Sequence, residues 1–362
     1  MNTTNATIES AESAQRVRQD RIISAVFEGA DSRDGIEERD GAGLAPSDED
    51  IQRAIAGVVE QAISPELRVW IKKYAEIGNR DDFLWKWCRR GVEVTTLPCT
   101  DADLREDVCD TKVLGVMLDV LLDDVADEQR DPAFLEYLLQ LLDGTPAEGS
   151  LQLSADQRRY AEATADVWSE IHARLHRYPR HAEYAAVLQF DYRQLFNTMR
   201  YSQLLNGDPA LLNLTEHDLY LPHNMHMMVS ASMDLMCSPA FNHAELGTLR
   251  EAAWRAQYMG RIGNLVTTWE REIGQRDYTS GVFASIVSAG DVAPAEIAAG
   301  DRSLIERAIR DGRHERRFLQ RWRRCRDEIL MLQPRVRSVD LGSLVSGLET
   351  LICLHLGSRG AK

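Results

Sequence analysis

Three aspartates cluster where an apolar segment of the chain ends. Residues 113–127 read Val-Leu-Gly-Val-Met-Leu-Asp-Val-Leu-Leu-Asp-Asp-Val-Ala-Asp and close on Asp123, Asp124 and Asp127. Asp123 and Asp127 are four residues apart, so a helix would direct both carboxylates from one face. These like charges repel one another, and the negative end of the helix dipole adds to the repulsion. An oxygen-only, carboxylate-rich site suits Mg²⁺ bound together with a substrate phosphate; the simpler alternative is an ordinary charged helix end.

A second polar stripe lies about 140 residues further along the chain. Asn264, Thr268 and Glu272 follow one another at intervals of four residues. On a helix, this spacing stacks an amide oxygen, a hydroxyl and a carboxylate along one face, which makes three oxygen ligands for one hard cation. Arg271, next to the last of them, could reach a phosphate. The alternative is a polar stripe on a surface helix, but Asn and Thr are poor helix formers, so helix propensity does not explain their presence.

The elements that carry both stripes are predicted to be helices. Apolar residues recur with a period near 3.6 through almost every segment after residue 46, as in Leu114, Met117, Leu118 and Leu121. Short Pro- and Gly-containing breaks separate these segments, and alternating strand patterns are nearly absent. The sequence therefore predicts one all-α domain over residues 47–362. The polar, mixed-charge residues 1–46 are expected to form a mobile arm.

Composition narrows the class of protein. The 362 residues include 42 basic and 57 acidic side chains, a net charge of −15, which argues against a nucleic-acid partner. No apolar run reaches the roughly 18 residues that a membrane-spanning helix needs, and the N-terminus shows no secretory signal. Six cysteines without a CxxC pair are expected to be buried thiols. These features predict a cytoplasmic protein.

Taken together, the two stripes resemble the metal site of class I terpene synthases. That family carries a DDxxD motif and, about 140 residues later, the pattern N-x-x-x-S/T-x-x-x-E, often with a basic residue before the Glu. The three aspartates match the first motif. Asn264, Thr268 and Glu272 match the second, with Arg271 in the basic place.

The resemblance implies an α-bundle around a central apolar cavity, and a carbon–oxygen lyase that ionises a prenyl diphosphate. Three Mg²⁺ ions would bind between the motifs and the substrate diphosphate. The implied metal ligands are Asp123, Asp124, Asp127, Asn264, Thr268 and Glu272. Asp123, Asp127, Asn264 and Glu272 are the expected catalytic residues. Arg271 and Arg359 are expected to bind the diphosphate. Cavity positions are expected at Phe83, Trp85, Tyr220 and Asn224.

Departures from the family pattern point to a subclass. Leu265 replaces an Asp that often follows the motif Asn, and position 218, where many bacterial sesquiterpene cyclases carry an arginine sensor, is Asp. Arg359 is followed by Gly360 rather than by Tyr. The chain thus looks most like bacterial labdane-related diterpene synthases of the biformene, terpentetriene and kaurene type. That likeness implies a copalyl-type bicyclic substrate made by a separate class II cyclase, and deprotonation to a labdatriene such as biformene. Homodimers are common in the family.

Other functions stay open at this point. The same site could take an acyclic farnesyl or geranylgeranyl diphosphate. A chain-elongating prenyltransferase ranks lower, because it needs a second DDxxD where this sequence has the Asn-Thr-Glu pattern. A non-catalytic helical interaction protein is the alternative outside enzymology.

Overall fold

The chain folds as an all-α bundle. The computed structural model describes residues 48–144 and 152–359, and no strand occurs among them. The expected arm at 1–46 lies outside the described residues. The α-helices are α2 (Asp48–Val59), α3 (Pro65–Tyr74), α4 (Asp82–Thr95), α5 (Arg105–Asp123), α6 (Pro132–Asp143), α7 (Ala155–Leu175), α8 (His181–Gly207), α9 (Leu214–Tyr220), α10 (Met227–Met236), α11 (Leu246–Gln275), α12 (Gly281–Ser288), α13 (Pro294–Ala299), α14 (Arg302–Asp311), α15 (His314–Met331) and α16 (Leu341–Gly357). A π-helix, η1 (Asp124–Gln129), and 3₁₀ turns η2 (Pro209–Leu211), η3 (Leu221–Met225), η4 (His243–Glu245) and η5 (Gln333–Arg335) complete the elements.

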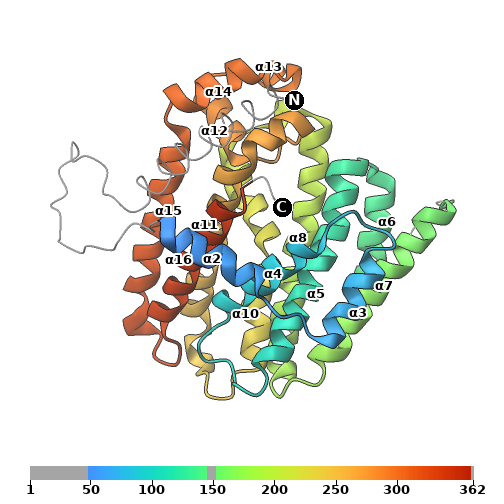
Figure 1. The fold of residues 1–362 in the computed structure, drawn as a ribbon, viewed down its shortest axis with the longest axis vertical. Coiled ribbons are helices and arrows are strands. Elements are labelled where there is room, and N and C mark those ends of the chain that lie inside the picture. The colour runs from blue at the N-terminus through green and yellow to red at the C-terminus, as the bar shows by residue number, and fades with distance from the viewer. Residues whose placement is uncertain (1–47, 145–151, 360–362) are drawn as a thin grey trace, which may run out of the picture.

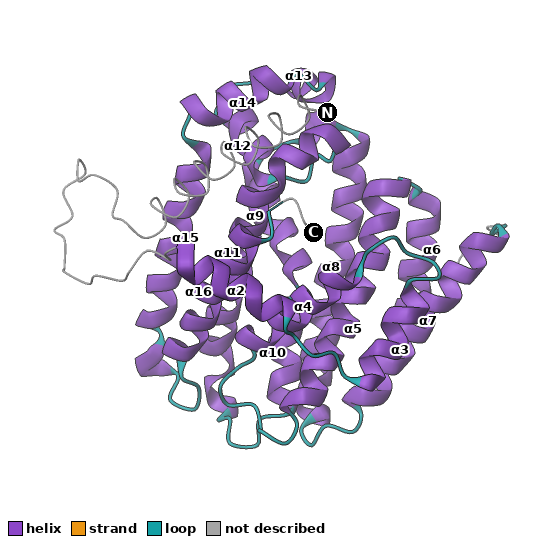
Figure 2. Cartoon of the chain, in the orientation of Figure 1, coloured by secondary structure: helices purple, strands orange, loops and turns teal. Residues whose placement is uncertain are grey.

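The two predicted motifs lie on helices that belong to different parts of the bundle. Figure 1 shows α11 beside α15 and α16 on one side, and α5 beside α7 on the other. Helices α8 and α10 pack against each other, and α10 also packs against both α5 and α11. Figure 2 shows the same arrangement as helices joined by short loops. Residues that are far apart in the sequence are thus brought to one bundle interior.

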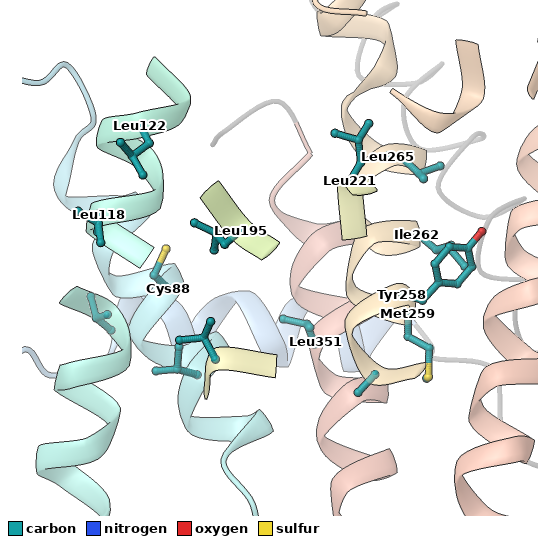
Figure 3. Packing of buried hydrophobic residues seen from close by; sticks show 14 of the residues in the cluster. Cys88, Leu118, Leu122, Leu195, Leu221, Tyr258, Met259, Ile262, Leu265 and Leu351 are labelled. Carbon is teal, nitrogen blue, oxygen red and sulfur yellow. The ribbon is translucent and has the colours of Figure 1, made fainter. Parts of the chain in front are cut away.

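The core is a continuous apolar cluster that reaches every major helix. Figure 3 shows Leu118 and Leu122 on α5, Leu195 on α8, and Ile262 and Leu265 on α11. Each of these side chains is at most 1% exposed. All six cysteines are free thiols, four of them buried and two partly buried, as the sequence predicts. Among the described residues, no helix is both long and apolar enough to cross a bilayer.

One ion pair is enclosed completely by this core. Lys112 on α5 is fully buried, and its Nζ lies 2.5 Å from Asp234 Oδ1 and 2.9 Å from Thr96 Oγ1. The other carboxylate oxygen of Asp234 accepts a hydrogen bond from the Leu97 backbone amide. This network joins α5 and α10 to the C-terminal end of α4. Removing one partner would leave a buried charge without its counter-ion.

We therefore expect Lys112→Met to lower the free energy of unfolding by about 3–5 kcal/mol, because Asp234 loses its counter-charge. Urea denaturation followed by circular dichroism measures the change. The double variant Lys112→Met/Asp234→Leu removes both charges and should recover much of the loss. Equal stability of the single variant and the wild type would show that the pair contributes little.

Candidate functional site

The aspartate motif straddles a change of helix type. Helix α5 ends at Asp123, and the next six residues form the π-helix η1, which ends at Arg130 in the left-handed region (φ 53°). Single π turns occur often at functional sites. The sequence predicts the helix to residue 127 but not this wider last turn. Asp123 and Asp127 stay about one turn apart, so both carboxylates still leave one side of the segment.

The carboxylates of Asp123 and Asp127 are held by asparagines from other elements. Asn224 Nδ2 donates to Asp123 Oδ1 at 3.1 Å, and Asn206 Nδ2 donates to Asp127 Oδ1 at 2.7 Å. Burial and the neighbouring charge of Asp277 raise the pKa of Asp123 to about 6. Burial and the charges of Asp123 and Asp277 raise the pKa of Asp127 as well. Ionised carboxylates are thus destabilised here, which a bound cation would relieve.

Asp124 has a different environment from the other two. Its carboxylate pairs with Arg80 from the α3–α4 loop and accepts a hydrogen bond from Tyr74 Oη at 3.4 Å. Arg80 also contacts Glu128 at 3.0 Å. Burial raises the pKa of Asp124, and the Arg80 charge opposes that rise. In the structure, Asp124 therefore connects η1 to the loop between α3 and α4.

The second motif lies on one face of α11, as its spacing predicts. Thr268 Oγ1 lies 2.6 Å from Glu272 Oε1, and Asn264 Oδ1 accepts a hydrogen bond from Arg261 Nη1 at 3.3 Å. Glu272 is 4% exposed, and its Oε2 makes no hydrogen bond within the described part of the chain. Burial and the charge of Asp277 raise the pKa of Glu272 to about 7.

Two side chains connect the aspartate motif to the C-terminal end of α11, just past the second motif. Asn206, at the end of α8, donates to Asp127 while its Oδ1 accepts from the Tyr278 amide at 2.7 Å, just past α11. Arg130 donates to the carbonyl oxygens of Arg276 at 2.9 Å and Gln275 at 3.3 Å. Arg276 is itself left-handed (φ 55°) and ends α11, which turns the chain back so that Asp277 faces both motifs.

Three residues of this site are not predicted from the sequence. Asp277 lies beyond the end of α11, so no helical spacing connects it to Glu272. Asn206 is separated from both motifs by tens of residues. Arg261 is 5% exposed and donates to the Thr279 carbonyl at 2.7 Å, and its charge lowers the pKa of both Asp123 and Glu272. The one sequence feature that indicates Arg261 is its position three residues before Asn264, on the same face of the helix.

The two arginines predicted to bind a diphosphate lie in different settings. Arg271 is exposed on α11. The Arg359 side chain is 6% exposed and donates to Glu270 Oε2 at 3.3 Å. Asp218, which occupies the expected sensor position, accepts hydrogen bonds from Arg321 at 2.6 Å and Tyr258 at 2.8 Å. That carboxylate is therefore engaged by α11 and α15.

An apolar cavity of about 160 Å³ extends from Asp123 into the bundle. Its lining residues are Trp87, Cys88, Gly91, Val92, Thr95, Val116, Asp119, Val120, Asp123, Asn224, Met225, His226, Met227, Ser230 and Leu351. Figure 3 shows two of them, Cys88 on α4 and Leu351 on α16.

Asn224 lines this cavity as expected, and the three aromatic residues expected there do not. Trp85 packs edge-on against Tyr74 with ring centroids 4.8 Å apart, and Phe83 packs on the core near it. Trp87 lies two residues further along α4 and lines the cavity instead. Two residues correspond to more than half a turn around the helix axis, so Trp85 and Trp87 point to nearly opposite sides. Tyr220 is 37% exposed and packs against Tyr201.

The donor chemistry of the two motifs fits Mg²⁺. Every candidate ligand offers oxygen, and Glu272 keeps one buried oxygen without a hydrogen bond. Among the described residues, no three Asp, Glu, His or Cys side chains converge tightly enough to enclose an ion by themselves. Mg²⁺ characteristically binds to one or two protein carboxylates and completes its shell with water and substrate phosphates. The motifs therefore suit ions that are shared with a phosphate ligand.

Comparisons with known proteins give distant structural neighbours. No family model matches the chain, and no curated protein matches it in sequence. The linalool/nerolidol synthase from Streptomyces clavuligerus, solved with 2-fluorogeranyl diphosphate, superposes with a TM-score of 0.49 at 15% identity, covering 85% of this chain and 96% of that one. The T. brucei farnesyl diphosphate synthase superposes with a TM-score of 0.45 at 13% identity, covering 87% and 97%.

Proposed function

We propose that the protein is a Mg²⁺-dependent class I terpene synthase that ionises a prenyl diphosphate. The observation that carries this proposal is that Asn206 and Arg130 join the aspartate motif to the C-terminal end of α11, the helix of the second oxygen-donor motif, while Asp123 also lines an apolar cavity. An ordinary charged helix end would not need a buried asparagine, Asn206, and an arginine, Arg130, to hold it against the end of another helix that carries a buried carboxylate.

Each residue has a defined task in this proposal. Asp123 and Asp127 would hold metal ions on one side, and Asn264, Thr268 and Glu272 would hold one on the other. Bound Mg²⁺ would draw negative charge onto the diphosphate and so assist its departure. Arg261, buried beside Asn264, adds positive charge on the α11 side. The apolar lining then keeps water away from the carbocation.

For the substrate, we propose a bicyclic labdane diphosphate of the copalyl type. The residue at the sensor position supports this choice, because Asp218 is anionic and already bound by Arg321 and Tyr258. A preformed bicycle needs less folding by the enzyme than an acyclic chain. An acyclic prenyl diphosphate is the second candidate, supported by the same motifs. The bicyclic substrate would require a separate class II cyclase to supply it.

A substrate panel tests both proposals. Purified protein with Mg²⁺ is incubated separately with copalyl, geranylgeranyl and farnesyl diphosphates, with released diphosphate assayed and hydrocarbon extracts analysed by mass spectrometry. A C20 hydrocarbon from copalyl diphosphate alone supports the labdane substrate. Product only from an acyclic substrate rejects the labdane proposal but keeps the enzyme class. No Mg²⁺-dependent diphosphate release from any of them rejects the class.

Asn206→Ala should weaken Mg²⁺ activation about tenfold, because the variant frees Asp127 and the Tyr278 amide from their shared partner. The Mg²⁺ concentration for half-maximal activity measures the effect. Asn197→Ala, on the same helix but in contact with Arg200, is the matched control and should keep the wild-type value. An unchanged Mg²⁺ requirement in Asn206→Ala would show that the bridge does not position the motif.

A further inference from the structure

Three buried polar groups beside the apolar cavity belong to neither metal motif. They are Asp119 on α5, Tyr192 on α8 and His226 between η3 and α10, and each is at most 5% exposed. Within the described chain, Asp119 Oδ1, Tyr192 Oη and His226 Nε2 make no hydrogen bond. Unsatisfied polar atoms in a dry interior are costly, so each one in a native protein needs an explanation, and a catalytic role is one of the recognised explanations.

The three groups lie along one face of α5, at increasing distance from Asp123: Asp119 is on the helix itself, and His226 and Tyr192 lie beside Gly115. Gly115, Asp119 and Asp123 are successive i, i+4, i+8 positions, so they lie one above another. Asn224 contacts Asp123 at the top of this face, and His226 lies against Gly115 at its lower end. Gly115 is about 12 Å along the helix axis from Asp123, the depth at which the carbon chain of a substrate would lie rather than its diphosphate.

The packing around His226 fixes its ring closely. A Cβ on Gly115 would lie 2.4 Å from His226 Cε1, 2.6 Å from Nε2 and 3.4 Å from Tyr192 Oη, so only glycine leaves room for the ring. His226 has a left-handed backbone (φ 58°), which is uncommon for a residue with a side chain. Its Nδ1 lies 3.3 Å from Ser230 Oγ. With the proton on Nδ1 donated to Ser230, the Nε2 lone pair is available as an acceptor.

The chemistry of this position suits a proton acceptor. Burial and the Lys112 charge lower the pKa of His226 to about 3, which keeps the imidazole neutral and so avoids repulsion of a carbocation. A C–H bond beside a cationic carbon is a very strong acid, so a weak base is sufficient. Once protonated, the ring would be stabilised by the Tyr192 ring, whose centroid lies 5.7 Å away.

Building on the proposed function, we propose that His226 is the base that ends the reaction. The C–H bond next to the cationic carbon breaks, its electron pair forms the C=C bond of the hydrocarbon, and the proton bonds to Nε2. The imidazolium then releases this proton to water once the hydrocarbon has left the cavity, which restores the neutral ring. The competing role for the same groups is to hold a water molecule that adds to the cation and yields an alcohol.

The test compares diphosphate release with hydrocarbon formation in His226→Asn. Asparagine tolerates the left-handed backbone and cannot take up a proton at neutral pH. We expect the yield of the wild-type hydrocarbon per diphosphate released to fall at least about tenfold, with the carbon diverted to isomers or alcohols. Gly115→Ala keeps the imidazole but displaces the ring and should shift the products in the same direction. His223→Asn, which alters a ring packed on Trp254, is the matched control.

The possible outcomes separate the two proposals. A wild-type hydrocarbon yield per diphosphate in a folded His226→Asn variant overturns the role of His226 and leaves the enzyme class intact. A wild-type enzyme whose main product is an alcohol also overturns it, in favour of bound water. If the wild type releases no diphosphate from any substrate, the proposed function fails first and the base with it. Should circular dichroism show that His226→Asn is unfolded, the product ratio of Gly115→Ala decides.

Discussion

Replacing Asp123 by alanine should lower the rate of diphosphate release by about 10²–10³-fold while the helical content remains that of the wild type. Asp123 lines the cavity, and Asn224, which also lines it, donates a hydrogen bond to its carboxylate. The carboxylate is also destabilised by burial and by Asp277, so its removal relieves repulsion and should not unfold the protein. We therefore expect the activity, and not the stability, to depend on this carboxylate.

Steady-state release of diphosphate from the preferred substrate, at saturating Mg²⁺, measures the effect. Asp143→Ala is the control, because it removes another aspartate from a helix end, one paired with Arg193. Asp124→Asn is informative beside them: its carboxylate pairs with Arg80, so we expect a loss of stability larger than its loss of turnover. Near-normal turnover in Asp123→Ala would remove the basis of the metal site.

Glu272→Gln should change activity and stability in opposite directions. The variant loses a carboxylate that we propose to bind metal, so we expect turnover to fall by about 10²–10³-fold. It also removes a charge that burial and Asp277 oppose, so the metal-free protein should become more stable by about 1–2 kcal/mol at pH 8. The new amide can still accept from Thr268 through its oxygen.

The pH dependence of this stability follows from the direction of the pKa shift. The pKa of Glu272 rises from 4.5 to about 7 on folding, so the folded state binds the extra proton more readily than the unfolded state. The destabilisation is therefore full above pH 7 and is lost as the pH falls through 7 toward 5. Asp123, with its pKa raised to about 6, acts in the same direction.

Buried histidines change the pH dependence of the unfolding free energy in the opposite direction, so the experiment must separate their contribution from that of Glu272. The pKa of His217 falls to about 4 and that of His226 to about 3, so stability from these neutral rings is lost as the pH drops below 6.5. Subtracting the unfolding free energy of the wild type from that of Glu272→Gln cancels these contributions. The difference should be largest at pH 8 and shrink toward pH 6, with Glu251→Gln on the same helix as control. A difference independent of pH would contradict the assigned cause.

The sequence predicts the helical class and the two oxygen stripes because both depend on local spacing. Asn264, Thr268 and Glu272 share a face for the same reason that any i, i+4, i+8 set does. Contacts between distant elements could not be predicted in this way: Asn206, Arg130 and Asp277 meet the motifs only once four helices have packed. The prediction that Trp85 lines the cavity, where the structure has Trp87, fails for a similar reason. Aromatic residues at alternate positions do not indicate which face of α4 points toward the cavity.

The bridge formed by Arg130 and Asn206 has a consequence for how the protein would respond to its ionic surroundings. The bridge holds Asp123, Asp127, Asp277 and Glu272 near one another against their mutual repulsion, at the expense of folding free energy. A cation that binds between these carboxylates reduces their repulsion and stabilises the folded state. Folding and cation binding are therefore thermodynamically linked. The melting temperature of the protein alone then becomes a gauge of divalent-ion affinity, which can rank Mg²⁺, Mn²⁺ and Ca²⁺ before a substrate is known.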